Sequence, residues 1–299
     1  LDVEDNVINF YYTVRTDIIY TVNYLEQGTN KVLAEAKVVT GKTFGTQVTE
    51  TAKDITGYTP VETSATITLA ASGNEINFYY TANTVAYTVN YLEKDTNKVL
   101  AEAKNATGTF GTQVTETAKD ITGYTPVETS ATITLAASGN EINFYYTANT
   151  VAYTVNYLEK DTNKVLAEAK NATGTFGTQV TETAKDITGY TPVETSATIT
   201  LAMEGNVITF YYTANTVEYT VNYLEQETNK VLAEAKTGTG TFGTDVTEDA
   251  IDIIGYSKVD PTTVTITLDV EDNVINFYYT VRTDIAYTVN YLEKDTGKV

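Results

Sequence analysis

The amino-acid sequence predicts an α+β protein built from small tandem repeats, and two observations support this prediction. First, the string Tyr-Thr-Val-Asn-Tyr-Leu-Glu recurs about every 66 residues, beginning at Tyr20, Tyr87, Tyr153, Tyr219 and Tyr287. Second, most of each repeat alternates apolar and polar residues as strands do, while one stretch spaces its apolar residues as a helix does. A fixed period of this length indicates an array of small folding units.

The landmarks divide the chain into four complete repeats and two partial ones. The predicted repeats are 18–84 (repeat 1), 85–150 (repeat 2), 151–216 (repeat 3) and 217–284 (repeat 4). Residues 1–17 would be the closing strands of a preceding repeat, and residues 285–299 the first strand of a following one. Residues 1–32 match residues 268–299 at 28 of 32 positions, which is expected if the chain is an excerpt of a longer array.

The first two strands are predicted from alternation and from a polar break. Tyr87–Glu93 places large apolar residues on one face and polar residues on the other, as a half-buried strand does. Residues 94–98 are a polar turn cluster, and residues 99–103 resume apolar character. The two segments therefore predict a hairpin.

A short helix is predicted over residues 112–122. Val114, Ala118 and Ile121 are spaced four and three apart and would form one apolar stripe. Thr112 would be the N-cap of this helix, and Gly123 would follow its C-terminus. The many threonines of this segment are unfavourable in a helix.

Two further strands, residues 131–135 and 141–147, complete the repeat around a Ser-Gly-Asn turn. The order β-β-α-β-β predicts a β-grasp-like unit of about 66 residues, with the helix across one sheet face and the first and last strands adjacent. The linker of residues 147–152 is short and contains no glycine, so we expect the repeats to form a fairly stiff, extended rod.

Composition excludes several classes of function. A net charge of −20 disfavours nucleic acid and anionic membranes as partners. The absence of cysteine and histidine removes disulfides, thiolate zinc sites and the commonest general base. No stretch is long and apolar enough for membrane insertion. We expect no cofactor, no metal and no enzymatic activity.

These landmarks resemble the MucBP repeat, the mucin-binding-protein module of Gram-positive surface proteins. The matching features are the opening Tyr-x-Val-x-Tyr strand, the Gly-x-Phe-Gly loop at residues 108–111, the run at residues 117–124 and the closing Phe-Tyr-Tyr. The resemblance implies an extracellular, cell-wall-attached adhesin whose repeats serve adhesion or spacing. It brings no defined binding residues with it.

Tyrosine, with 24 copies, is the most prominent candidate for ligand contact. Tyr87, Tyr91, Tyr124 and Tyr146 are expected to fill the core. The middle residue of each Phe-Tyr-Tyr alternates to the other face of its strand. We therefore predict ligand contacts at four outward-facing tyrosines: Tyr79, Tyr145, Tyr211 and Tyr278.

Three other groups of residues could carry chemistry, and each has a simpler explanation. The acidic turns at residues 2–6 and 269–273 could offer oxygen ligands to calcium, but a solvated turn is favoured. Glu93 and Asp95 could pair as glycosidase carboxylates, but they lie at a solvated strand end. An isopeptide bond from Asn90 to Lys98 or Lys104 is conceivable, and an exposed lysine is favoured.

Three functional hypotheses remain open from sequence. The array is a weak, multivalent binder of host glycan or mucin glycoprotein, a passive stalk, or a filament that self-associates laterally through edge strands. The acidic charge repels sialylated and sulfated glycans at long range, which favours a stalk or a neutral sugar.

Overall fold

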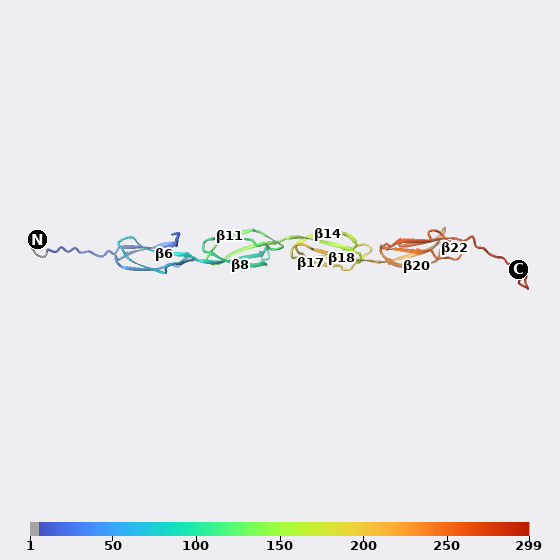
Figure 1. Cartoon of the computed structure of the whole chain (residues 1–299), viewed down its shortest axis with the longest axis horizontal. Coiled ribbons are helices and arrows are strands. Elements are labelled where there is room, and N and C mark those ends of the chain that lie inside the picture. The colour runs from blue at the N-terminus through green and yellow to red at the C-terminus, as the bar shows by residue number, and fades with distance from the viewer. Residues whose placement is uncertain (1–5, 299) are drawn as a thin grey trace. The chain divides into compact units, whose positions relative to one another are not determined.

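A computed structural model describes residues 6–298, and every regular element in that range is a β-strand. The α+β prediction is therefore wrong, and the fold is all-β. Each repeat forms six strands in two small sheets (Figure 1). The chain divides into two compact units, residues 1–149 and residues 150–299, with two repeats in each. The described residues contain no helix long and apolar enough to cross a membrane.

The strands of repeat 1 are β1 (Ile18–Glu26), β2 (Val32–Lys42), β3 (Gln47–Thr51), β4 (Tyr58–Pro60), β5 (Ser64–Thr68) and β6 (Asn74–Ala82). Those of repeat 2 are β7 (Thr84–Glu93), β8 (Val99–Thr109), β9 (Gln113–Thr117), β10 (Tyr124–Pro126), β11 (Ser130–Thr134) and β12 (Asn140–Ala148). Those of repeat 3 are β13 (Thr150–Glu159), β14 (Val165–Thr175), β15 (Gln179–Thr183), β16 (Tyr190–Pro192), β17 (Ser196–Thr200) and β18 (Val207–Ala214). Those of repeat 4 are β19 (Thr216–Glu225), β20 (Val231–Thr241), β21 (Asp245–Asp249), β22 (Tyr256–Lys258), β23 (Thr263–Thr267) and β24 (Val274–Val281).

All four repeats have the same sheet topology. In repeat 1 the larger sheet has the order β2-β1-β6-β4, and β3 pairs with β5 in a separate two-stranded sheet. The first and last strands, β1 and β6, are parallel neighbours at the centre, with Val22 opposite Ile76. The outer strands β2 and β4 are antiparallel to them. The predicted adjacency of the first and last strands is thus confirmed.

One face of the larger sheet forms the core of each repeat, and the two-stranded sheet covers it. In repeat 2 the almost fully buried residues of β7 and β12 are Tyr87, Val89, Tyr91, Ile142, Phe144 and Tyr146. Val114 of β9 and Ile133 of β11 pack against them from the smaller sheet. This arrangement follows from strict alternation along both central strands, which sends every second side chain to the same face.

The predicted helix over residues 112–122 is replaced by strand β9 and an irregular segment. Val114, Ala118 and Ile121 do face the core, as their spacing suggested. However, β-branched threonines favour a strand, and β9 pairs with β11 along its whole length, with Thr115 and Thr132 joined through their hydroxyls at 2.8 Å. Thr112 is therefore no N-cap: its N–H donates to Thr109 O and closes a turn.

The opposite face of the larger sheet carries no covering element within its repeat. In repeat 2 this open face presents Asn90, Leu92, Asn143 and Tyr145, which alternate with the core residues. Residues 6–17 and 285–298 form no strand, although the sequence predicts strands of neighbouring repeats there. That assignment stays a prediction.

Candidate functional site

The four tyrosines predicted to contact ligand all lie on the open faces of their sheets. Tyr79 and Tyr145 are each 38% exposed, Tyr211 is 40% exposed, and Tyr278 is half-buried. The neighbouring residues on each strand point into the core, so alternation alone separates the two sets. The tyrosines belong to four different repeats, and each repeat therefore has its own copy of the candidate site.

Each tyrosine has an apolar neighbour and, in three repeats, a pair of amides on the same face. Tyr145 lies directly across from Leu92 in the parallel register of β12 and β7. One step along, Asn90 Nδ2 donates to Asn143 Oδ1 at 2.8 Å. The corresponding pairs are Asn23 with Asn77 and Asn222 with Asn276, whereas repeat 3 has Thr209 at the second position. An exposed ring beside amide groups is suited to stacking on a sugar and to hydrogen bonding its hydroxyls.

The tyrosines expected in the core are there. Tyr87, Tyr91 and Tyr146 are buried, and Tyr124 packs against the same cluster while partly exposed. The Tyr146 hydroxyl donates to Lys119 O at 2.8 Å, so its polar atom is satisfied inside the repeat. Tyr87, Tyr91 and Tyr146 are therefore unavailable for ligand contact.

A cluster of tyrosine, glutamate and lysine, which sequence reasoning missed, ties the two sheets of each repeat together. In repeat 2 the Tyr87 hydroxyl donates to Glu116 Oε1 at 2.7 Å, and Lys104 Nζ donates to both carboxylate oxygens at 2.8 Å. Tyr87 and Lys104 belong to the larger sheet, while Glu116 belongs to β9 of the smaller one. The same cluster occurs in the other repeats as Tyr20, Lys37 and Glu50; Tyr153, Lys170 and Glu182; and Tyr219, Lys236 and Glu248.

The cluster shifts the pKa values of its members. Hydrogen bonds from Lys104 and then Tyr87 lower the pKa of Glu116. The hydrogen bond to Glu50, followed by burial, raises the pKa of Tyr20 to about 12. These shifts favour the ionised carboxylate and the neutral phenol in the folded state. The cluster is therefore a structural element that depends on pH.

We expect the chain to lose stability on both the acid and the alkaline side. The lowered pKa of Glu116 and its counterparts stabilises the folded state above the ordinary glutamate value of about 4.3. This stabilisation is lost as the pH falls through the lower folded pKa. The raised pKa of Tyr20 stabilises the folded state below the ordinary tyrosine value of about 10, and this stabilisation is lost between there and about 12.

Thermal unfolding followed by circular dichroism from pH 3 to pH 12 checks this expectation. The melting temperature should be flat near neutrality and fall at both ends. Replacing the four cluster glutamates (50, 116, 182 and 248) with glutamine should lower the neutral plateau and flatten the acid limb. An acid limb that is equally steep in that variant would contradict the assignment of the pH dependence to these carboxylates.

The residues considered for an isopeptide bond have other partners. Asn90 bonds Asn143 on the open face, while Lys104 forms its ion pair with Glu116. Lys98 lies exposed in the loop after β7. The geometry therefore does not bring Asn90 into contact with either lysine. Glu93 likewise accepts a hydrogen bond from the Thr96 hydroxyl within its own turn.

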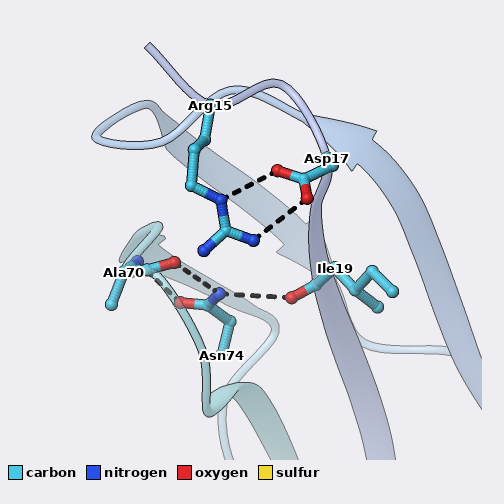
Figure 2. Close-up of polar contacts among 5 residues, drawn as sticks. All are labelled: Arg15, Asp17, Ile19, Ala70 and Asn74. Carbon is cyan, nitrogen blue, oxygen red and sulfur yellow. Dashed lines mark hydrogen bonds and ion pairs between the residues drawn. The ribbon is translucent and has the colours of Figure 1, made fainter. Parts of the chain in front are cut away.

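A buried asparagine, also missed from sequence, holds the turn before the last strand. In repeat 1, Asn74 Oδ1 accepts from Ala70 N at 2.7 Å, while its Nδ2 donates to Ala70 O at 3.0 Å and Ile19 O at 3.2 Å (Figure 2). Nearby, Arg15 forms a two-point ion pair with Asp17. Asn140, Asn206 and Asn273 make the same contacts in the other repeats. The recurrence of this asparagine in all four repeats was the signal that could have identified it.

The acidic turn at residues 269–273 is organised by this asparagine. The Asn273 side chain donates to Glu218 O and Asp269 O and accepts from Asp269 N. In addition, Asp269 Oδ1 accepts from Val270 N. Its counterpart at residues 2–6 lies outside the described residues except for Asn6. Across residues 6–298, no group of three or more acidic side chains is arranged to hold a metal ion.

The repeats also match known proteins. The family model of the MucBP domain matches four segments, residues 21–81, 87–147, 153–213 and 219–280. Internalin J of Listeria monocytogenes serotype 4b (strain F2365) is 35% identical over 282 residues, covering 89% of this chain and 30% of the relative. Internalin I of the same strain is 26% identical over 249 residues, covering 82% of this chain and 13% of the relative. The chain thus spans less than a third of the length of these relatives.

Solved structures give weaker matches. The Bacillus anthracis TIE protein aligns with a TM-score of 0.38 and 9% identity, covering 89% of this chain and 66% of that chain. Mub-RV aligns with a TM-score of 0.17 and 12% identity, covering 44% of this chain and 99% of that chain. The resemblance to MucBP repeats is confirmed by the family match. Together with the internalin relatives, it indicates an extracellular surface protein of Gram-positive type.

Proposed function

Because the chain belongs to the MucBP domain family, we propose that it is the repeat region of a surface adhesin, acting both as a semi-rigid stalk and as a weak, multivalent binder of glycan or mucin glycoprotein. Its attachment would be to the cell wall, and its role would be non-catalytic. The observation that carries the binding proposal is the outward-facing tyrosine on the open sheet face of every repeat, which is exposed in three repeats and half-buried in the fourth.

The open face suits weak and repeated contact rather than tight binding. Tyr145 offers a rigid ring at low entropic cost, and Leu92 extends the apolar surface beside it. Asn90 and Asn143 each retain donor or acceptor capacity beyond their mutual hydrogen bond. A flat surface of this kind buries little of a ligand, so repetition along the chain would supply the avidity.

The charge of the chain narrows the ligand class. With 39 acidic and 19 basic residues, the array repels sialylated or sulfated glycans. Neutral sugars escape this repulsion, so we propose neutral glycans as the ligands. Salt should then leave binding nearly unchanged, whereas it should strengthen binding to acidic glycans by screening the repulsion.

The stalk proposal is supported by the way strands pass from one repeat to the next inside each unit. Only Asn83 separates β6 from β7, and only Asn215 separates β18 from β19.

We also retain the proposed repeat boundaries, although β7, β13 and β19 begin one residue before them, at Thr84, Thr150 and Thr216.

Binding of the whole chain to immobilised mucin, before and after glycosidase treatment, tests the proposal. We expect saturable binding that disappears with the sugars. Replacing Tyr79, Tyr145, Tyr211 and Tyr278 with alanine should abolish it, and single replacements should weaken it by much less than the quadruple change. The matched control replaces four exposed threonines two residues further along the same strands: Thr81, Thr147, Thr213 and Thr280.

Equal binding by the tyrosine and threonine variants would contradict the assigned site. If the unaltered chain does not bind, the glycan-binding proposal is wrong and only the stalk proposal remains.

A structural fibre that associates laterally is the alternative proposal, and one observation favours it. The outer strands β2, β8, β14 and β20 each expose a valine, for example Val99 at 67%. Unpaired edges of this kind can add a strand from another chain. Light scattering that increases with protein concentration, and that falls when these valines become lysines, would support this alternative.

A further inference from the structure

A phenylalanine in each repeat sits at the tip of a tight turn. In repeat 2, Thr112 N donates to Thr109 O, and Gly111 occupies the left-handed region at φ 77°. This geometry is a type II turn, which requires glycine at the third position and leaves Phe110 at the second. The same turn carries Phe44 in repeat 1 and Phe242 in repeat 4.

The ring of Phe110 lies on a glycine of the preceding repeat. Gly57 has a φ of 83°, and a Cβ added to it would lie 2.4 Å from the Phe110 ring. Tyr58 meets the same ring edge-on, with the ring centroids 5.5 Å apart and the planes at 77°. Gly57 is therefore needed both for its backbone conformation and for the close approach of the ring.

One asparagine connects the two turns. Asn83 N donates to Gly57 O at 2.9 Å, and Asn83 O accepts from Phe110 N at 2.8 Å. Its side chain Oδ1 accepts from the Thr59 hydroxyl at 2.6 Å. The single linker residue is thus bonded to both repeats, beside the ring contact.

The second unit contains the same arrangement. Phe242 lies on Gly189, where a Cβ would approach to 2.4 Å, and meets Tyr190 at 5.5 Å and 81°. Asn215 N donates to Gly189 O and Asn215 O accepts from Phe242 N, both at 2.8 Å. Two independent occurrences show that the contact follows from the repeat sequence.

Within residues 6–298, the phenylalanine of repeat 1 and the Gly-Tyr turn of repeat 4 each stand without the ring contact. Phe44 is 48% exposed. Gly255 lies in a turn like that of Gly57, with φ 84° and Tyr256 N donating to Ile253 O at 3.1 Å. However, no atom of the described residues comes within 4 Å of the position that a Cβ on Gly255 would take. A hollow of about 510 Å³ lies there, lined by residues 252–258 and Arg282.

We propose that the Gly-Tyr turn is a receptor and the phenylalanine-bearing turn its ligand, so that the second repeat of each unit docks onto the first. We further assign the hollow at Gly255 and Tyr256 as an open receptor of the same kind, which takes the phenylalanine-bearing turn of another MucBP repeat. Strand continuity, the asparagine bridge and the seated ring together would fix the orientation of the second repeat. This docking does not depend on any glycan ligand.

A spin-label distance measurement tests the docking, because the chain has no cysteine of its own. Cysteines at the exposed positions Glu35 and Glu102 would place one label on repeat 1 and one on repeat 2. We expect a narrow distance distribution that at least doubles in width in Phe110→Ala. Phe44→Ala removes the same residue from a turn whose ring is 48% exposed and should leave the width unchanged. Equal widths in all three proteins would overturn the proposal.

A pair of glycine variants gives a second readout. Gly57→Ala and Gly255→Ala impose the same backbone strain, because the two φ values are nearly identical. Only Gly57→Ala also displaces a ring, so its melting temperature should fall further. Equal falls in the melting temperature of the two glycine variants would overturn the proposal, even if Phe110→Ala altered the folding of its own turn.

The open receptor can be filled by design. Residues 268–299 repeat residues 1–32 almost unchanged, so appending residues 33–84 after Val299 would add a further copy of repeat 1. Its phenylalanine should seat on Gly255, and Gly255→Ala should then lower the melting temperature as much as Gly57→Ala does. An unchanged effect of Gly255→Ala in the extended chain would show that the hollow is no receptor.

Discussion

Replacing Tyr146 with alanine is expected to unfold repeat 2. Tyr146 is fully buried between the two sheets, and its hydroxyl donates to Lys119 O at 2.8 Å. Removing a large buried aromatic side chain costs about 3–5 kcal/mol through lost burial and the cavity left behind. A domain of this size has a total stability of roughly 3–10 kcal/mol. The change therefore removes a large part of what holds the repeat together, and the carbonyl of Lys119 also loses its donor.

Tyr145→Ala is the matched control, because it makes the same change at the adjacent position on the open face. We expect it to alter stability by about 0.5 kcal/mol or less. Hydrogen exchange with mass spectrometry would measure both variants, and the peptide carrying the substitution has a mass of its own although repeats 2 and 3 are nearly identical. Similar protection of β12 in the two variants would contradict the assigned core. If Tyr146→Ala speeds amide hydrogen exchange in repeat 2 alone, the repeats unfold as separate units within the array.

The strands were predictable because burial of every second residue produces an alternation of apolar and polar residues in the sequence. Alternation correctly placed the hairpin, the central pair and the inward tyrosines, and it correctly separated Tyr145 from its buried neighbours. The helix was wrong because Ala118 and Ile121 reach the core from irregular backbone, which a spacing of four and three residues cannot distinguish from a helix. Strand β10 was missed because three residues are too few to show a period.

The polar contacts were not predictable from pattern because their partners are distant in sequence. Glu116 joins Tyr87 and Lys104 only once the small sheet has folded over the large one. Likewise, the run that ends in Gly123-Tyr124 and the Gly-x-Phe-Gly loop both served as landmarks, but the contact between such segments crosses from one repeat to the next. The recurrence of these residues indicated that they matter, but it did not identify the residues that they contact.

Replacing Asn74 with alanine is expected to destabilise repeat 1 by about 2–4 kcal/mol, since each buried group left without its partner costs about 1–3 kcal/mol. The change removes three hydrogen bonds that close the turn between β5 and β6 and tie it to Ile19 of β1 (Figure 2). Chemical denaturation followed by tyrosine fluorescence would measure the loss. Asn77→Ala on the same strand is the control, because Asn77 is exposed and its side chain accepts one hydrogen bond, from Asn23.

Asn74→Asp distinguishes lost hydrogen bonds from lost volume, because aspartate has nearly the same shape but no N–H donor when ionised. The two carbonyls of Ala70 and Ile19 would then face a carboxylate, which raises the pKa of the new side chain and destabilises the fold at neutral pH. Protonation restores one donor, so the stability difference from the unaltered chain should narrow as the pH falls from the raised folded pKa toward the ordinary aspartate value of about 3.9. A difference that does not change with pH would mean that the carbonyls do not depend on the amide, and that Asn74 acts by packing alone.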